Sequence, residues 1–312
     1  MARQFAQPKT KIQPAVQTIR FEVPSGASAK FIDLSAAASI VNRRFYRQGL
    51  NWAVAGITMI AAPSASGTVK FSKLPNTWVT SNAWEKAFRM WKRQQDEALE
   101  GQESIKGRFN DFKIFADSDM ATGVAPYHLV PIDLTGTPYN VAGREWNYSQ
   151  VVLPNDAGVP GATTERTLHM VGGNITGVTA SLTKAYKDSR ATPQSPDPAT
   201  PGSASVGLFT DMFNVGLDDS EIVANAEFRN NDLPYNQDQY PGGPSNAGTC
   251  ELIDEIFLNP ASTVPGKYHM QGSNIPCGLI RIDSGASTNI TVILHLMPGD
   301  HRGYLTEKMQ EM

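Results

Sequence analysis

Apolar runs of strand length recur along this chain of 312 residues, and segments rich in proline and glycine separate them. The clearest runs cover residues 18–23, 52–60, 252–258, 278–283 and 289–297. These runs do not alternate with helical patterns, so a parallel βαβ sheet is not expected. The 26 glycines and 21 prolines suit many turns. The pattern therefore predicts an all-β fold, an antiparallel sandwich with long loops.

One segment, residues 81–100, has the pattern of an amphipathic α-helix. Its apolar residues recur at helical spacing along one face, at Trp84, Ala87, Phe88 and Trp91. Ser81 or Asn82 can cap its start, and Gly101 can end it. The aromatic face could bind a ligand, but such stripes far more often pack in a core. We therefore expect this helix to lie against the outside of a sheet.

The charges are divided unevenly along the chain. Residues 1–83 carry ten Lys or Arg and two Asp or Glu, a net of +8, whereas residues 114–312 carry ten and twenty-two, a net of −12. This difference is typical of a protein whose two sides meet different surroundings, although ordinary solvation would also account for it. The sequence has no apolar run of about 18 residues, so no membrane span is expected.

The motifs of common enzyme classes are missing from the sequence. It has no G-x-S-x-G elbow, no P-loop and no dinucleotide fingerprint, and its five histidines form no HExxH motif. Asp117 and Asp119 alternate like calcium-loop acids, but the series stops there. Cys250 and Cys277 are too few for a disulfide framework. We expect no enzyme, no metal and no cofactor. Paired carboxylates for glycoside cleavage stay open, because that pairing is spatial.

A basic segment lies between the apolar residues near Phe31 and the buried strand at 52–60. It contains Arg43, Arg44, Phe45, Tyr46, Arg47 and Gln48. Arginines interleaved with aromatic rings can contact phosphates and stack on bases, so these arginines are candidate nucleic-acid-binding residues. If residues 35–48 are helical, Arg43 and Arg47 share one face. Alternatively, the rings belong to the core and the arginines form ion pairs with a neighbouring chain or loop.

Four stretches of the sequence resemble capsid proteins of small viruses with circular single-stranded DNA genomes. They are IDLSAAASIVNRRFYRQGLNWAVAGI (32–57), LPNTWVTSNAWEKAFRMW (74–91), FNDFKIFAD (109–117) and CGLIRIDSGASTNITVILHLMPGDHRGYL (277–305). The resemblance implies a jelly-roll capsid domain, residues 19–312, that assembles with itself into an icosahedral virion shell around the genome. It also implies an inward-facing basic front and an extended arm, residues 1–18.

One departure from this family pattern concerns the arm. Many such capsid proteins begin with a dense arginine-rich segment, whereas this chain has only Arg3, Lys9, Lys11 and Arg20 there. We count Lys9 and Lys11 as candidate contacts, but most of the DNA binding is expected at residues 43–47. The loops 117–143, 154–180, 192–205 and 230–249 are expected to form the outer surface and subunit contacts. The chain length permits two barrels, and a carbohydrate-binding or glycoside-cleaving β-sandwich is the alternative function.

Overall fold

The computed structural model of the protein is mainly β, with two antiparallel sheets packed face to face. It describes residues 13–26, 29–101, 104, 111–122, 128–142, 146–154, 163–175, 178–191, 250–260 and 266–312. The first sheet has the order β10 (Lys267–Ile275), β3 (Leu50–Ala61), β12 (Ile290–Leu296), β1 (Thr18–Val23) and β5 (Pro131–Ile132), and β15 (Thr306–Lys308) also pairs with β3. The second has the order β2 (Ala29–Asp33), β11 (Leu279–Ser284), β4 (Gly67–Lys73) and β9 (Glu251–Leu258). The predicted antiparallel sandwich is thereby confirmed.

The eight main strands pair in a nested order. The first strand along the chain, β1, pairs with the last, β12, and in the same way β2 pairs with β11, β3 with β10 and β4 with β9. All four pairs are antiparallel. The chain thus forms one long ribbon of paired strands that folds over on itself, so that pairs fall alternately into the two sheets.

The link 284–288, with the sequence SGAST, has the composition of a tight hairpin turn, but it does not form one. It connects β11 in the second sheet to β12 in the first, so the chain crosses the sandwich here. The amide of Gly285 donates to Thr68 O at 2.8 Å, and that of Ser287 donates to Ser66 O at 2.9 Å. These bonds hold the link against the connection between β3 and β4, and neither closes a tight turn.

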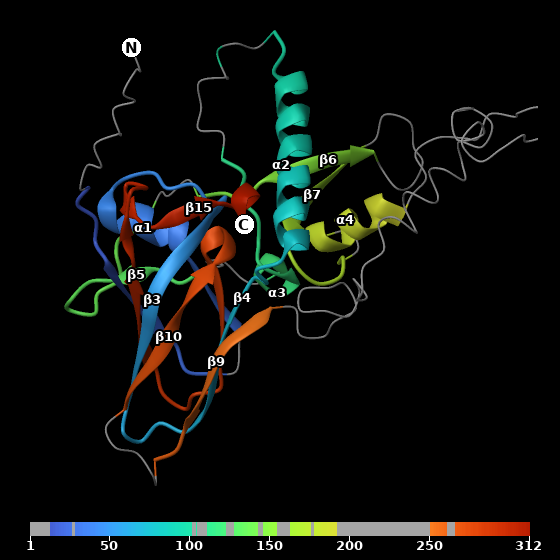
Figure 1. The fold of residues 1–312 in the computed structure, drawn as a ribbon. Helices are drawn as coiled ribbons and strands as arrows, with labels where there is room; N and C mark the ends of the chain where they lie inside the picture. Colours follow the sequence, from blue (N-terminus) through green and yellow to red (C-terminus); the bar gives the residue numbers. More distant parts are fainter. Residues whose placement is uncertain are drawn as a thin grey trace, which may run out of the picture.

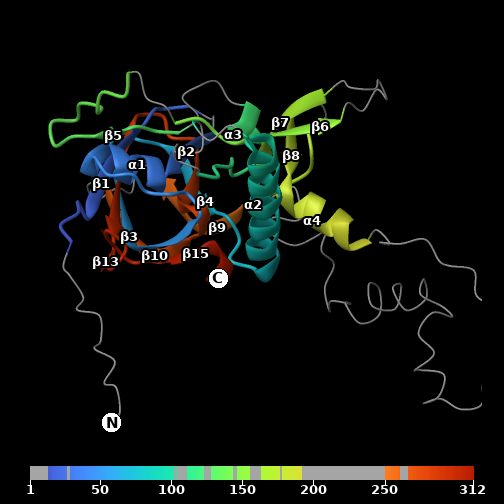
Figure 2. The same ribbon diagram turned by 90° about the horizontal axis from the view of Figure 1, so that it is seen from above.

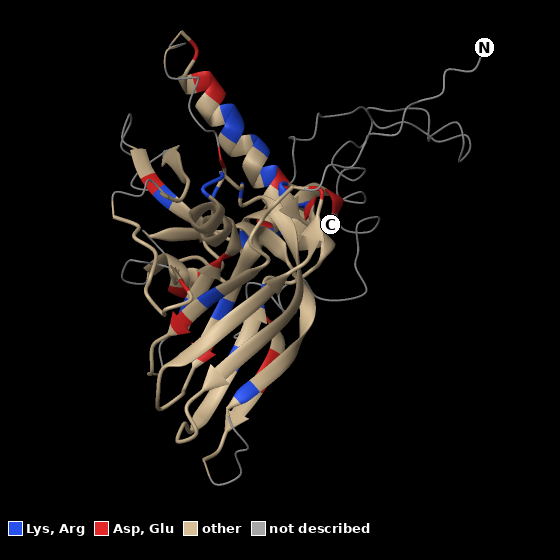
Figure 3. Ribbon diagram, turned by 90° about the vertical axis from the view of Figure 1, so that its left-hand side faces the viewer, with Lys and Arg blue, Asp and Glu red and all other residues tan. Residues whose placement is uncertain are grey.

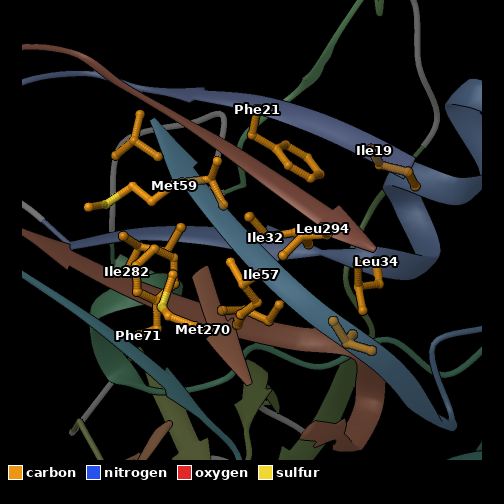
Figure 4. Close-up of a cluster of buried hydrophobic side chains, with 14 of the residues drawn as sticks. Ile19, Phe21, Ile32, Leu34, Ile57, Met59, Phe71, Met270, Ile282 and Leu294 are labelled. Carbon is orange, nitrogen blue, oxygen red and sulfur yellow. The ribbon is translucent and has the colours of Figure 1, made fainter. Parts of the chain in front are cut away.

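The core lies between the two sheets because alternate residues of each strand point inward. Ile19, Phe21 and Val23 of β1 are buried, and so are Ile280 and Ile282 of β11. Figure 4 shows such side chains from both sheets meeting across the interior, where they fill the space between the sheets. The interior of the sandwich is therefore a packed apolar core.

Most of the described residues between β4 and β9 build a second, smaller lobe, which contains α2 and a three-stranded sheet, whereas β5 joins the first sheet. The described helices are α1 (Leu34–Asn42), α2 (Trp78–Ala98), α3 (Ser118–Thr122) and α4 (Leu182–Ala191), with 3-10 turns η3 (Pro276–Gly278) and η4 (Met309–Glu311). The small sheet has the order β6 (Gln150–Pro154), β7 (Thr163–His169) and β8 (Thr179–Ser181), and β13 (Pro298–Gly299) pairs with β14 (Gly303–Tyr304). Besides α2, the helix that the sequence predicts most clearly, α1 covers the first part of residues 35–48, whose helical character the sequence left open.

The predicted helix exists, but its start and its packing differ from the prediction. It begins at Trp78, where Thr77 accepts a hydrogen bond from the amide of Thr80, so residues 77–79 belong to the cap and first turn. It stands beyond one end of the sandwich and packs against α4 and η4, and Gln94 joins it to Val152 of β6 (Figures 1 and 2). The reason is that Trp84 and Trp91 belong to a second apolar cluster, separate from the core of the sandwich. The other members of this cluster pack against the aromatic face of the helix.

Candidate nucleic-acid interface

The basic segment is an irregular loop and not a helix. Helix α1 ends at Asn42, and Arg43 adopts the left-handed conformation with φ 53° and ψ 37°. The side-chain amide of Asn42 donates through Nδ2 to Ala38 O at 2.9 Å and to the Tyr304 hydroxyl at 2.7 Å, which fixes this end of the helix. The condition under which Arg43 and Arg47 would share one helical face is therefore not met.

The loop is held by two buried side chains that alternate with exposed arginines. Arg43, Arg44 and Arg47 are exposed, whereas Tyr46 and Gln48 are fully buried. The Tyr46 hydroxyl donates to Arg302 O at 3.0 Å, and its ring packs against neighbouring aromatic rings. The arginine backbones are thus fixed in place, while their side chains lie at the surface.

Gln48, which the sequence groups with the arginines, is instead an internal anchor. Its Nε2 donates to Ile114 O at 3.0 Å, and its Oε1 accepts from the amide of Ile114 at 2.7 Å. The same Nε2 donates to Asp33 Oδ2 at 3.2 Å. Gln48 therefore joins the loop to the start of α1 and to the second lobe, and it is unavailable to a ligand.

Arg302 joins these arginines in space, although it lies far away in the sequence. Its Nη1 donates to Phe45 O, and Arg44 Nη1 donates to Pro14 O at 3.1 Å. Burial raises the pKa of Tyr46, and the nearby charges of Arg44 and Arg302 oppose this effect. The side chain of Arg302 is exposed and its φ is 52°, also left-handed. A sequence pattern could not reveal it, because only the pairing of β13 with β14 brings it here.

Two buried carboxyls lie beneath the loop. Asp33 caps α1 by accepting from the amides of Ser35 and Ala36, and the Trp146 indole also donates to it at 3.2 Å. Burial raises the pKa of Asp33 to about 6, an effect that these hydrogen bonds only partly offset. Burial likewise raises the pKa of Asp111 to about 6, while the charges of Lys113 and Arg47 lower it. Arg47 therefore also interacts with the protein itself, as the alternative interpretation expects.

Arg43 differs from the cations of α2. On that helix, Arg89, Lys92 and Arg93 form ion pairs with carboxylates four residues away, and basic and acidic segments follow each other along it (Figure 3). In contrast, the Arg43 side chain forms no hydrogen bond or ion pair with the residues that the structure describes. Lys9 and Lys11, the other predicted contacts, lie outside the described residues, as do the loops 192–205 and 230–249.

The remaining candidate residues have structural partners. Asp117 and Asp119 both bind the Arg281 guanidinium, at 2.5 and 2.7 Å, so they tie α3 to β11. No cluster of three or more metal-ligating side chains occurs among the described residues. Cys277 is a buried free thiol, and Cys250 Sγ donates to Asp117 Oδ2 at 3.9 Å.

Comparison with protein families, with curated proteins and with solved structures returns no match. Within the described residues, no helix has the length and the apolar character to cross a membrane.

Proposed function

We propose that the protein is a viral capsid protein that assembles into an icosahedral shell around a single-stranded DNA genome. The observation that carries this proposal is the nested pairing of eight strands in two facing sheets. A ribbon of four antiparallel pairs that is folded across two sheets is the arrangement of a jelly roll, an architecture that recurs in capsid and lectin domains. Because one fold serves many functions, the proposal also needs support from the surface.

The interior of the sandwich is filled, which leaves the outer surface for binding. Cupin-type and lipocalin-type sandwiches and barrels can hold ligands inside, but here apolar side chains fill the space between the sheets. Binding must therefore take place on the outside, as it does when shell subunits meet side by side. The edge strand β9 exposes Phe257 (71%) and Leu252 (52%), which suits burial against another subunit.

The loop that carries Arg43, Arg44 and Arg47 is the proposed contact with the genome. Each arginine can neutralise one phosphate, and the burial of Tyr46 and Gln48 holds the backbone in position before DNA arrives. The proposed orientation places this loop inside the shell and the second lobe with its loops toward the exterior and the neighbouring subunits. This orientation agrees with the basic character of residues 1–83.

Negative-stain microscopy and light scattering of the purified protein test the proposal. We expect closed particles of uniform diameter, with co-purifying nucleic acid that raises the absorbance at 260 nm. The triple substitution of Arg43, Arg44 and Arg47 by alanine is expected to lower that absorbance, whereas Met90→Ala on α2 provides an exposed, uncharged control. Monomers alone, over a range of salt, pH and added single-stranded DNA, would refute shell assembly.

A further inference from the structure

A cleft of about 400 Å³ opens beside Arg47, between the start of α2, the loop that follows Arg47 and the C-terminal segment. Its lining includes Arg47, Trp84, Phe88, Asp111, Phe112 and Glu307. This volume falls within the range of small-molecule sites, roughly 300 to 1,000 Å³. The cleft is thus adjacent to the arginine loop and shares one residue with it.

Aromatic rings form one wall of the cleft. Trp84 and Phe88 are stacked, with ring centroids 5.2 Å apart and planes 14° apart, and Phe112 meets Trp84 edge to face at 5.9 Å. Trp84 also lies directly against Gly49, where a Cβ atom would come within 2.3 Å of the indole ring. The aromatic wall is therefore fixed against the loop of Arg47, and Phe88, which is only half-buried, completes it.

Two polar atoms of the lining residues are buried without a hydrogen-bond partner in the described part of the chain, although Asp111 forms an ion pair with Lys113. Trp84 Nε1 is buried without a hydrogen-bond acceptor among the described residues, and Asp111 Oδ2 is buried without a donor. The nearest cation to Asp111, Lys113 Nζ, is 3.6 Å away, too far for a hydrogen bond. Buried polar groups normally find partners, so a donor and an acceptor left unsatisfied beside the cleft are groups that a ligand would satisfy once the side chains around them move.

From these observations we infer that the cleft binds one unpaired nucleobase of single-stranded DNA. A base is planar, it stacks on aromatic rings, and its edge presents both N–H donors and carbonyl or ring-nitrogen acceptors. The flanking phosphates would lie on Arg43, Arg44 and Arg302, next to the cleft. Duplex DNA does not fit, because its bases are already paired and stacked. This inference rests on the proposed function and adds base contacts to its phosphate contacts.

Fluorescence anisotropy with the unassembled full-length protein tests this inference. The probes are short single-stranded oligonucleotides and matched abasic strands, which carry the same phosphates without bases. We expect the base-containing strands to bind at least about fivefold more tightly, as stacking of one base implies. Phe88→Ala should remove this difference and leave the affinity for abasic strands unchanged, whereas Met90→Ala on the same helix should preserve it.

A second variant guards against misfolding, and the outcomes separate the two proposals. Phe88→Leu keeps the apolar volume but not the ring, and it should also lose the preference for base-containing strands while its thermal unfolding stays close to that of the parent protein.

Equal binding of base-containing and abasic strands, with normal assembly, overturns the base site and leaves the shell proposal intact. Failure to bind any DNA, together with failure to assemble, overturns both. Neutral oligosaccharides that bind in a Phe88-dependent manner would overturn the base site in favour of a carbohydrate site.

Discussion

Replacing Arg43 by glycine should make the protein more stable and weaken its binding to DNA. Arg43 has φ 53° and ψ 37°, a conformation that costs a residue with a Cβ atom about 1–2 kcal/mol. Glycine avoids this cost. However, glycine also has more conformational freedom in the unfolded chain, which stabilises the unfolded state by about 0.4–1 kcal/mol and offsets part of the gain. The net gain in the free energy of unfolding is about 0–1.6 kcal/mol, with a central value of about 0.8 kcal/mol. No hydrogen bond or ion pair to the described residues is lost, because the Arg43 side chain forms none.

The same substitution removes one cation from the proposed phosphate site. For single strands, each neutralised phosphate contributes about 0.7 to the slope of log affinity against log salt concentration. Urea unfolding of the unassembled subunit would measure the stability, and anisotropy titrations at several salt concentrations would measure the slope. We expect Arg43→Gly to lower the slope by about this amount per subunit.

Two further variants separate charge from backbone strain. Arg43→Asn should also be more stable than the parent protein, since asparagine tolerates the left-handed conformation. It should lose the proposed phosphate contact, because its side chain carries no charge. Arg43→Lys keeps the charge and the strain, so its stability and salt slope should match those of the parent protein. The reasoning is refuted if the glycine variant is less stable than the parent, or if its salt slope is unchanged.

The remaining predictions concern the groups beneath the loop. Gln48→Leu leaves the amide and carbonyl of Ile114 unpaired in the interior, at about 1–3 kcal/mol for each group, so urea unfolding should reveal a loss of about 2–6 kcal/mol. A loss below 1 kcal/mol would show that this anchor is unimportant. Burial raises the pKa values of Asp33 and Asp111 from 3.8 to about 6, so the folded protein holds these protons more tightly than the unfolded chain. The free energy of unfolding should therefore fall as the pH rises from 3.8 to about 6, and Asp111→Asn should flatten this dependence in thermal unfolding at constant ionic strength. A parent protein whose pH dependence over this range is identical to that of Asp111→Asn would contradict the assignment.

The sandwich could be predicted because its strands carry local signals. β1 was predicted with its observed bounds, and β3, β9, β11 and β12 to within two residues, since each has a buried apolar face or a continuous apolar run. Their connections could not be predicted in the same way. The link between β11 and β12 has the composition of a tight turn, but hydrogen bonds to Ser66 and Thr68 decide its path.

The candidate site was predicted only in part. Exposure of the three arginines follows from their charge, but nothing local reveals that Gln48 is internal, because its partner Ile114 lies 66 residues away. The possibility that residues 35–48 are helical throughout fails for a related reason. Residues 43–48 have acceptable helix propensity, yet the burial of Tyr46 between Trp52 and Tyr304 requires the chain to leave the helix at Asn42.

The conformations of Arg43 and Arg302 connect the fold to the proposed function. Both have positive φ, at positions where glycine would cost less, and both are exposed, with the carbonyl of Arg302 accepting from the Tyr46 hydroxyl. Strain of this kind persists where the surroundings impose it, and it is concentrated at functional sites. A flexible basic arm loses conformational entropy when it binds DNA, whereas a loop held by Tyr46 and Gln48 has lost that entropy during folding. Fewer cations per subunit can then suffice, since a closed shell presents many copies of the loop to one strand and their contacts act together.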